Sequence, residues 1–238
     1  CDEEGMSVTS VDNAAGALKI LENTEVRLAL CDIMMQGMDG FQFLEALENS
    51  GLHVPVVMMT GYSTMENAVK SLSMGAVDYI PKPFTADELL TVIQRSLRSG
   101  NLREKAYAAK FGRDRTMSFV PCPTGHYRLG YVSWVMMEDE GTAKIGVSDL
   151  FLKSVEGIRK FELSEVGDQL VQGVPCAVAT ANDGNKHGIM CPMGGKILEV
   201  NEEARTNPLL VDKDPLFRGW LYRILPSNPD NKLRWLKS

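Results

Sequence analysis

The first hundred residues alternate short apolar runs with segments whose apolar residues recur at helical spacing. The predicted strands span residues 6–11, 28–31, 54–59 and 76–80, and the predicted helices span 14–21, 39–47, 63–74 and 85–97. Asp12 or Asn13 is expected to cap the first helix, and Thr85 with Glu88 forms a capping box at the last. Strands and helices that alternate at this length form parallel βαβ units. The sequence therefore predicts an α/β part built on a parallel sheet.

The charge is distributed unevenly and suggests where this part ends. Residues 1–100 hold 6 Lys+Arg against 14 Asp+Glu, residues 101–120 hold 5 against 2, and the whole chain carries a net charge of −6. We interpret the basic, polar stretch at residues 99–125 as a solvated linker, partly helical at 102–109, with a nucleic-acid patch as the alternative. An acidic chain is not typical of non-specific nucleic-acid binding.

Two absences in the sequence restrict the class of protein. No apolar run approaches the ~18–20 residues of a membrane span. The five cysteines are scattered without a CxxC pair, which is typical of reduced thiols. We therefore expect a cytoplasmic protein that does not bind DNA or a membrane. Residue 1 is Cys rather than Met, which we interpret as the start of a fragment or of a processed chain.

Polar side chains follow three of the predicted strands. Asp32 comes after residues 28–31, Thr60 follows residues 54–59, and Lys82 follows residues 76–80. In parallel sheets the carboxyl ends of the strands meet at one edge, where ligands bind. A carboxylate can become an aspartyl-phosphate, and a hydroxyl and an ammonium can bind phosphoryl oxygens. The pattern therefore indicates phosphoryl-transfer chemistry.

Three motifs resemble the receiver domain of two-component response regulators. They are Asp-Ile-Met-Met-Gln-Gly-Met-Asp-Gly at residues 32–40, Met-Met-Thr-Gly-Tyr at 58–62, and Gly-Ala-Val-Asp-Tyr-Ile-Pro-Lys-Pro-Phe at 75–84. The resemblance covers about residues 1–98 and implies a flavodoxin-like parallel-sheet domain. Its partner would be a sensor histidine kinase.

The resemblance also implies a role for each matching residue. Asp32 would be the phosphoacceptor, Thr60 and Lys82 would bind the phosphoryl group, and Lys82–Pro83 would be a cis peptide. Tyr79 would be an aromatic switch, the alternative being an ordinary half-buried strand residue. Asp32 and the backbone carbonyl of Met34 would be ligands of Mg²⁺.

The sequence departs from the receiver pattern in two places. Gln36 stands where proline is usual. The family's first strand, with its acidic pair for Mg²⁺, and its first helix have no counterpart, because Asp2, Glu3 and Glu4 lie too close to the next strand. We therefore expect an N-terminally truncated receiver that folds poorly alone and takes no phosphate from acetyl phosphate. Mg²⁺ would bind in the full-length parent.

The second half favours an all-β structure. The predicted strands are 131–136, 142–147, 158–163, 169–170, 175–180, 187–191, 196–200 and 217–224, with helical segments at 148–155 and 201–205. Short strands at this spacing are typical of a sandwich or barrel. We expect His126 and His187 to be surface or hydrogen-bonded histidines and Cys191 to be a buried thiol. No catalytic constellation is evident, so we do not expect an enzyme.

Six segments of this half resemble the glycine-cleavage H protein. They lie at residues 132–135, 146–149, 162–167, 191–201, 207–215 and 219–221, within a match of about 126–228. The resemblance implies a lipoyl-type barrel-sandwich hybrid over residues 126–238.

The lysine that carries lipoate in that family has no equivalent here. Counting along the predicted hairpin places it at Asp183 or Gly184, and the acidic residue three before it becomes Thr180. Lys186 is a weak candidate that lies two or three residues past the tip, so lipoate is not expected.

Three functional hypotheses remain open. The first is phosphorelay signalling through Asp32, with a non-lipoylated H-like domain as the output or docking module for an unknown protein partner. The second is a lipoyl carrier, modified at Lys186 and regulated by the receiver. The third is a scaffold that binds glycine-cleavage or related enzymes.

Overall fold

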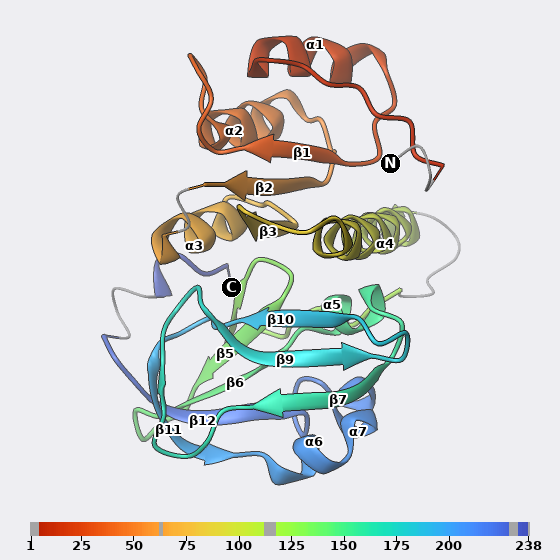
Figure 1. The fold of residues 1–238 in the computed structure, drawn as a ribbon. Coiled ribbons are helices and arrows are strands. Elements are labelled where there is room, and N and C mark those ends of the chain that lie inside the picture. Colours follow the sequence, from red (N-terminus) through yellow and green to blue (C-terminus); the bar gives the residue numbers. More distant parts are fainter. Residues whose placement is uncertain (1–4, 62–63, 112–117, 229–232, 238) are drawn as a thin grey trace.

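A computed structural model describes residues 5–61, 64–111, 118–228 and 233–237. An N-terminal α/β part (residues 5–111) is stacked on a C-terminal β part (residues 118–237) (Figure 1). Helices α1, α2 and α3 pack against one face of the parallel sheet and α4 packs against the other, and α3 and α4 are the helices next to the C-terminal part.

The N-terminal part follows the predicted alternation of strands and helices. Its elements are α1 (Ala14–Asn23), β1 (Ala29–Asp32), α2 (Gly40–Ser50), β2 (Val56–Thr60), α3 (Met65–Ser73), β3 (Asp78–Pro81) and α4 (Ala86–Phe111). The strands pair in parallel in the order β1-β2-β3. The predicted α/β fold class is therefore confirmed.

Side-chain caps fix where these helices begin. The Asn13 side chain accepts from the backbone N of Gly16 at 2.8 Å, which selects Asn13 over Asp12 as the cap of α1. The predicted capping box at Thr85 is present, because Glu88 Oε2 accepts from the Thr85 N at 2.7 Å and Thr85 Oγ1 accepts from the Glu88 N.

Two predicted elements differ in the structure. Residues 6–11 form no strand, because no described strand pairs with them and a strand needs a neighbour for its backbone hydrogen bonds. Helix α4 continues past residue 97 to Phe111. The helix runs through Gly100, where the absence of a side chain allows close packing against Pro55. A Cβ at Gly100 would lie 2.8 Å from Cγ of Pro55.

Over residues 118–228 and 233–237, the C-terminal part has two antiparallel sheets and three named short helices. Its elements are β4 (His126–Leu129), β5 (Ser133–Met137), β6 (Ala143–Val147), α5 (Asp149–Ser154), β7 (Ile158–Leu163), β8 (Gln169–Leu170), β9 (Pro175–Ala181), β10 (Lys186–Met190), β11 (Gly195–Val200), α6 (Glu202–Thr206), α7 (Pro208–Lys213) and β12 (Trp220–Pro226). One sheet has the order β10-β9-β7 and the other β4-β5-β6-β12-β11-β8. The predicted all-β class is confirmed, and β4 and α7 are additions to it.

A close-packed core holds the C-terminal part together. The Trp134 side chain is fully buried, and its Nε1 donates to the carbonyl of Val147 at 3.0 Å. Its ring lies so close to Gly146 that a Cβ there would be 2.2 Å from the ring. The sequence therefore needs glycine on β6, opposite the tryptophan.

Candidate functional site

Asp32 and Lys82 meet at the carboxyl end of the parallel sheet. Asp32 is the last residue of β1, and Lys82 directly follows β3. The Nζ of Lys82 donates to Oδ2 of Asp32 at 2.6 Å. The Asp32 side chain is one-third exposed, at 33%, so a phosphoryl donor can reach it. Its Oδ1 accepts from the backbone N of Met34 at 3.1 Å.

Thr60 lies beside this pair at the end of β2. It is fully buried and stands opposite Pro81 in the register of β2 with β3. Its backbone carbonyl accepts from the N of Lys82 at 2.7 Å. The peptide bond Lys82–Pro83 is cis, as predicted. The structure thus brings Asp32, Thr60 and Lys82 to one edge of the sheet.

Tyr79 points into the core of the α/β part. It is 6% exposed, more buried than the alternative of a half-buried strand residue implies. Its hydroxyl has no hydrogen-bond partner among the described residues, and burial raises its pKa. Whether Tyr79 acts as a switch stays a prediction.

Two of the expected Mg²⁺ ligands, Asp32 and Met34, lie within the described residues. Asp32 offers its carboxylate and Met34 its backbone carbonyl, and Met34 is well exposed. Asp2, Glu3 and Glu4 lie outside the described residues. Within residues 5–61, 64–111, 118–228 and 233–237, no three His, Cys, Asp or Glu side chains gather as a metal site.

The hairpin tip between β9 and β10 has turn chemistry of its own. The Asp183 Oδ1 accepts from the backbone N of Asn185 at 2.9 Å, and Gly184 has a φ of +91°. Lys186 is the first residue of β10 and pairs with Thr180. Its ammonium lies 3.5 Å from Oε1 of Glu162, which lowers the pKa of that carboxyl.

The two histidines of the C-terminal part are both buried. His126 packs edge-on against Trp134, with 4.9 Å between ring centroids, and neither ring nitrogen has a described hydrogen-bond partner. Burial lowers its pKa. His187 is hydrogen-bonded, as predicted. Cys191 is fully buried, also as predicted.

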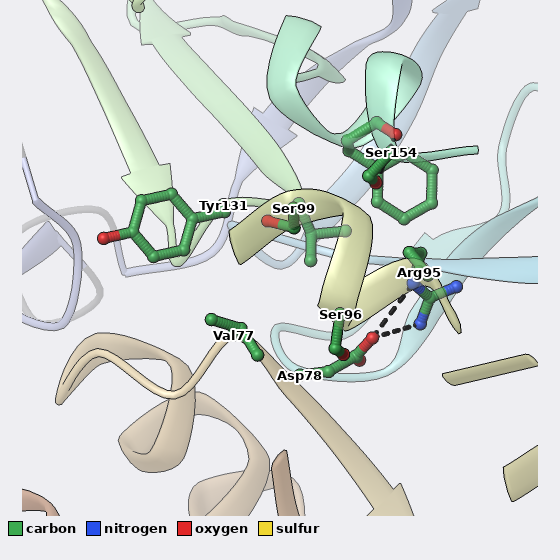
Figure 2. Close-up of a pocket in the computed structure, with 9 residues that line it drawn as sticks. Val77, Asp78, Arg95, Ser96, Ser99, Tyr131 and Ser154 are labelled. Atoms are coloured by element: carbon green, nitrogen blue, oxygen red, sulfur yellow. Dashed lines mark hydrogen bonds and ion pairs between the residues drawn. The ribbon is translucent and has the colours of Figure 1, made fainter. Parts of the chain in front are cut away.

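Sequence reasoning missed a polar cluster where the two parts meet. Arg95 of α4 donates from Nε to Oδ2 of Asp78 at 2.9 Å and from Nη1 to Nδ1 of His187 at 2.8 Å. Figure 2 shows Arg95 and Asp78 joined, beside Ser96. These three residues line a cavity of about 10 Å³. Arg98 and Arg103 also reach the C-terminal part from this helix, so no spacing rule singled out Arg95 among the arginines of α4.

None of the helices in the described stretches is long and apolar enough to cross a membrane.

Family models match both parts of the chain. Residues 1–94 match the response regulator receiver domain, and residues 126–238 match the glycine cleavage H-protein. The chain therefore carries a receiver domain followed by an H-protein domain.

Curated relatives match the first part. The nitrogen assimilation regulatory protein NtrX of Azorhizobium caulinodans is 35% identical over 111 residues, which is 46% of this chain and 24% of that protein. The response regulator protein FleR of Pseudomonas aeruginosa is 38% identical over 91 residues, or 38% of this chain and 19% of FleR. The chain thus spans a quarter or less of the length of these relatives.

Solved structures resemble each part. The receiver domain of NtrX from Brucella abortus is 36% identical, covers 40% of this chain and 82% of its own, and has a TM-score of 0.39. A glycine cleavage system H protein from Mycobacterium marinum is 23% identical, covers 44% of this chain and 86% of its own, and has a TM-score of 0.42.

Proposed function

We propose that this chain, a receiver domain joined to an H-protein domain, accepts a phosphoryl group on Asp32 from a sensor histidine kinase. The contact between Asp32 Oδ2 and Lys82 Nζ at 2.6 Å is the observation that carries the proposal. It puts a partly exposed carboxylate beside a cation at the edge of the sheet where ligands of parallel sheets bind.

The transfer balances without an added reactant. The ionised Asp32 carboxylate attacks phosphorus, an O–P bond forms, and the N–P bond of the phosphohistidine breaks with its electron pair left on the imidazole. The product carries a charge of about −2, which Lys82 offsets by charge-assisted hydrogen bonds. Thr60 and Tyr79 are proposed to respond to that new charge.

Mg²⁺ is proposed to bind beside the phosphoacceptor through Asp32 and the Met34 carbonyl. These are hard oxygen donors of the kind that Mg²⁺ prefers, and the ion would keep most of its water ligands. When bound, it would neutralise charge on the phosphoryl oxygens.

The H-protein domain is proposed to be the output or docking module for a protein partner. The hairpin tip supports this role over a lipoyl carrier, because Asp183 and Gly184 stand where a lysine would be needed. The domain boundaries proposed are residues 1–98 for the receiver, 99–125 for the linker and 126–238 for the H-protein domain.

Phosphotransfer to the natural protein that contains this sequence tests the assignment. Labelled phosphate should pass from an autophosphorylated histidine kinase to the wild type and to the control variant Asp12→Asn, whose carboxylate is exposed and outside the site. Asp32→Asn should abolish labelling. Labelling retained at another residue of Asp32→Asn would contradict the assignment.

A lipoyl carrier is the second candidate, and the exposure of Lys186 favours it. That side chain is 64% exposed. Intact mass after coexpression with a lipoyl ligase separates the two functions. A lipoyl adduct that Lys186→Arg removes would establish the carrier, whereas an unmodified mass supports the signalling module.

A further inference from the structure

A buried seam joins the two domains along one face of the receiver. Helices α3 and α4 face the H-protein domain (Figure 1). On α3, Val69 packs against Leu129 of β4. A Cβ added to Gly173 would lie 2.6 Å from Cγ2 of Val69, so the H-protein backbone approaches α3 more closely than any larger residue permits. Arg98 of α4 forms an ion pair with Glu156 at 2.7 Å.

Arg95 is the residue that both domains hold. In the receiver, Asp78 accepts a hydrogen bond from Arg95 Nε at 2.9 Å. In the H-protein domain, His187 accepts one from Arg95 Nη1 at 2.8 Å. Its guanidinium carbon lies 5.3 Å from the ring centre of Phe151 on α5. The Arg95 side chain is only 10% exposed. Neither domain alone supplies partners to both sides of this guanidinium.

The receiver half of the cluster is continuous with the phosphorylation site. Oδ1 of Asp78 accepts from the backbone N of Tyr79 at 2.9 Å, so one carboxylate is bonded to both Tyr79 and Arg95. Lys82 lies four residues after Asp78, which is about 13 Å along an extended chain at ~3.3 Å per residue. A displacement of β3 at Lys82 therefore also displaces Asp78.

We propose that Arg95 couples the state of Asp32 to strand β10 of the H-protein domain. The path runs from Lys82 along β3 to Asp78, through the Arg95 guanidinium, and into the β9–β10 hairpin at His187. The inference rests on the proposed function only in taking Asp32 as the site whose state is transmitted. Arg95 acts here as a positioning residue between two domains of one chain.

The chemistry of the cluster explains why such a link transmits small shifts. Arginine cannot lose its charge, and a buried donor that loses its partner is costly. Movement of β3 must therefore either carry His187 with it or break a buried hydrogen bond. Coupling of this kind is reciprocal, so a change at β10 also alters the environment of Asp32.

Amide hydrogen exchange on the 238-residue chain tests the coupling without phosphorylation. Asp32→Asn removes the charge that holds Lys82, and we expect it to change the exchange rates of residues 186–190 at least threefold. Amides of β12, away from the seam, serve as the internal reference. In an Arg95→Met background the response should vanish, and in the control Lys105→Met, an exposed residue of α4, it should persist.

A second pair of variants guards against misfolding of Arg95→Met. His187→Asn keeps a hydrogen-bond acceptor and should retain the response, whereas His187→Phe removes the acceptor and should lose it. Unchanged exchange at β10 in Asp32→Asn, or a full response in Arg95→Met or His187→Phe, would overturn the coupling.

The phosphotransfer assay keeps this result separate from the proposed function. Coupled exchange in a protein that takes no label on Asp32 would support the link while refuting the phosphoacceptor. Label on Asp32 without coupled exchange would refute the link alone.

Discussion

The ammonium of Lys82 is bonded to the carboxylate of Asp32, although the two residues are 50 positions apart and follow different strands. This contact depends on two parallel strands, β1 and β3, that flank β2 and end at the same edge. The pair is one-third exposed, at 37% for Lys82 and 33% for Asp32. A phosphoryl group on Asp32 would therefore meet a cation already in place.

Removing that cation should slow phosphotransfer. For Lys82→Met we expect a loss of about tenfold in the rate of labelling of Asp32, because a partly exposed charge-assisted hydrogen bond contributes roughly 1.5 kcal/mol. Time courses of labelling by a phosphorylated kinase measure the effect, with Lys105→Met as the control. A rate equal to wild type would mean that Lys82 does not bind the phosphoryl group.

The hydroxyl of Tyr79 should oppose folding in the unphosphorylated protein. It is buried without a described partner, and an unsatisfied polar group costs about 1 kcal/mol or more. We expect Tyr79→Phe to raise the free energy of unfolding by about 1 kcal/mol, and Tyr79→Ala to lower it by roughly 3 kcal/mol through the cavity left behind. Urea unfolding measures both. A loss of stability in Tyr79→Phe would show that the hydroxyl is bonded in solution.

Local sequence rules predicted most of the fold because the signals are local. Caps such as Asn13 and Thr85 mark helix starts through bonds to residues three positions on, and they held. The prediction of a strand at residues 6–11 was wrong, because a strand forms only beside a neighbouring strand and the segment's own sequence does not encode that neighbour. Helix α7 was not predicted, although Pro208 at its first position is itself a local start signal.

Some residues of the site could also be predicted from local rules, and others could not. Asp32, Thr60 and Lys82 each stand at a strand end, so the rule that parallel strands end at one edge predicts from sequence that they lie together. The contact between Arg95 and His187 joins two domains, and no spacing rule relates residues 92 positions apart on different folds. Such a contact follows from the packing of whole domains, which sequence patterns do not describe.

Lowering the pH should reduce the free energy of unfolding through the protonation of His187. Burial, followed by the charge of Arg95, lowers its pKa from 6.5 to about 4, with Arg98 acting in the same direction and Asp183 against it. Because the folded pKa lies below the unfolded one, the neutral ring contributes stability that is complete above pH 6.5 and is lost as the pH falls toward 4.

The measurement compares wild type with His187→Asn between pH 7.5 and 5. We expect the wild type to lose about 2 kcal/mol more than the variant over this range, because the unfolded state takes up a proton over about 1.5 pH units at ~1.36 kcal/mol each. Glu138 also has a lowered pKa, through bonds from Thr142, Arg223 and Lys144, but its contribution is lost only as the pH falls below about 4.5. Equal losses in both proteins would mean that His187 is protonated in the folded state.

Glycine at position 173 should be required by the seam between the domains. Gly173 has a φ of +80°, and a Cβ there would meet Cγ2 of Val69 at 2.6 Å and the carbonyl oxygen of Met65 at 2.8 Å. Gly167 has a φ of +98° with open space around its Cβ position. Alanine at either site has the same backbone strain, but only Gly173→Ala also pushes against α3.

We therefore expect Gly167→Ala to cost about 1 kcal/mol and Gly173→Ala to cost roughly 2 kcal/mol more, since overpacking a rigid contact with backbone is destabilising. Urea unfolding gives the two free energies, and hydrogen exchange of α3 shows where the difference arises. In Gly173→Ala the amides of Met65–Ser73 should exchange faster, while Gly167→Ala should leave them unchanged. Equal costs without faster exchange in α3 would mean that the two domains do not pack at Gly173 in solution.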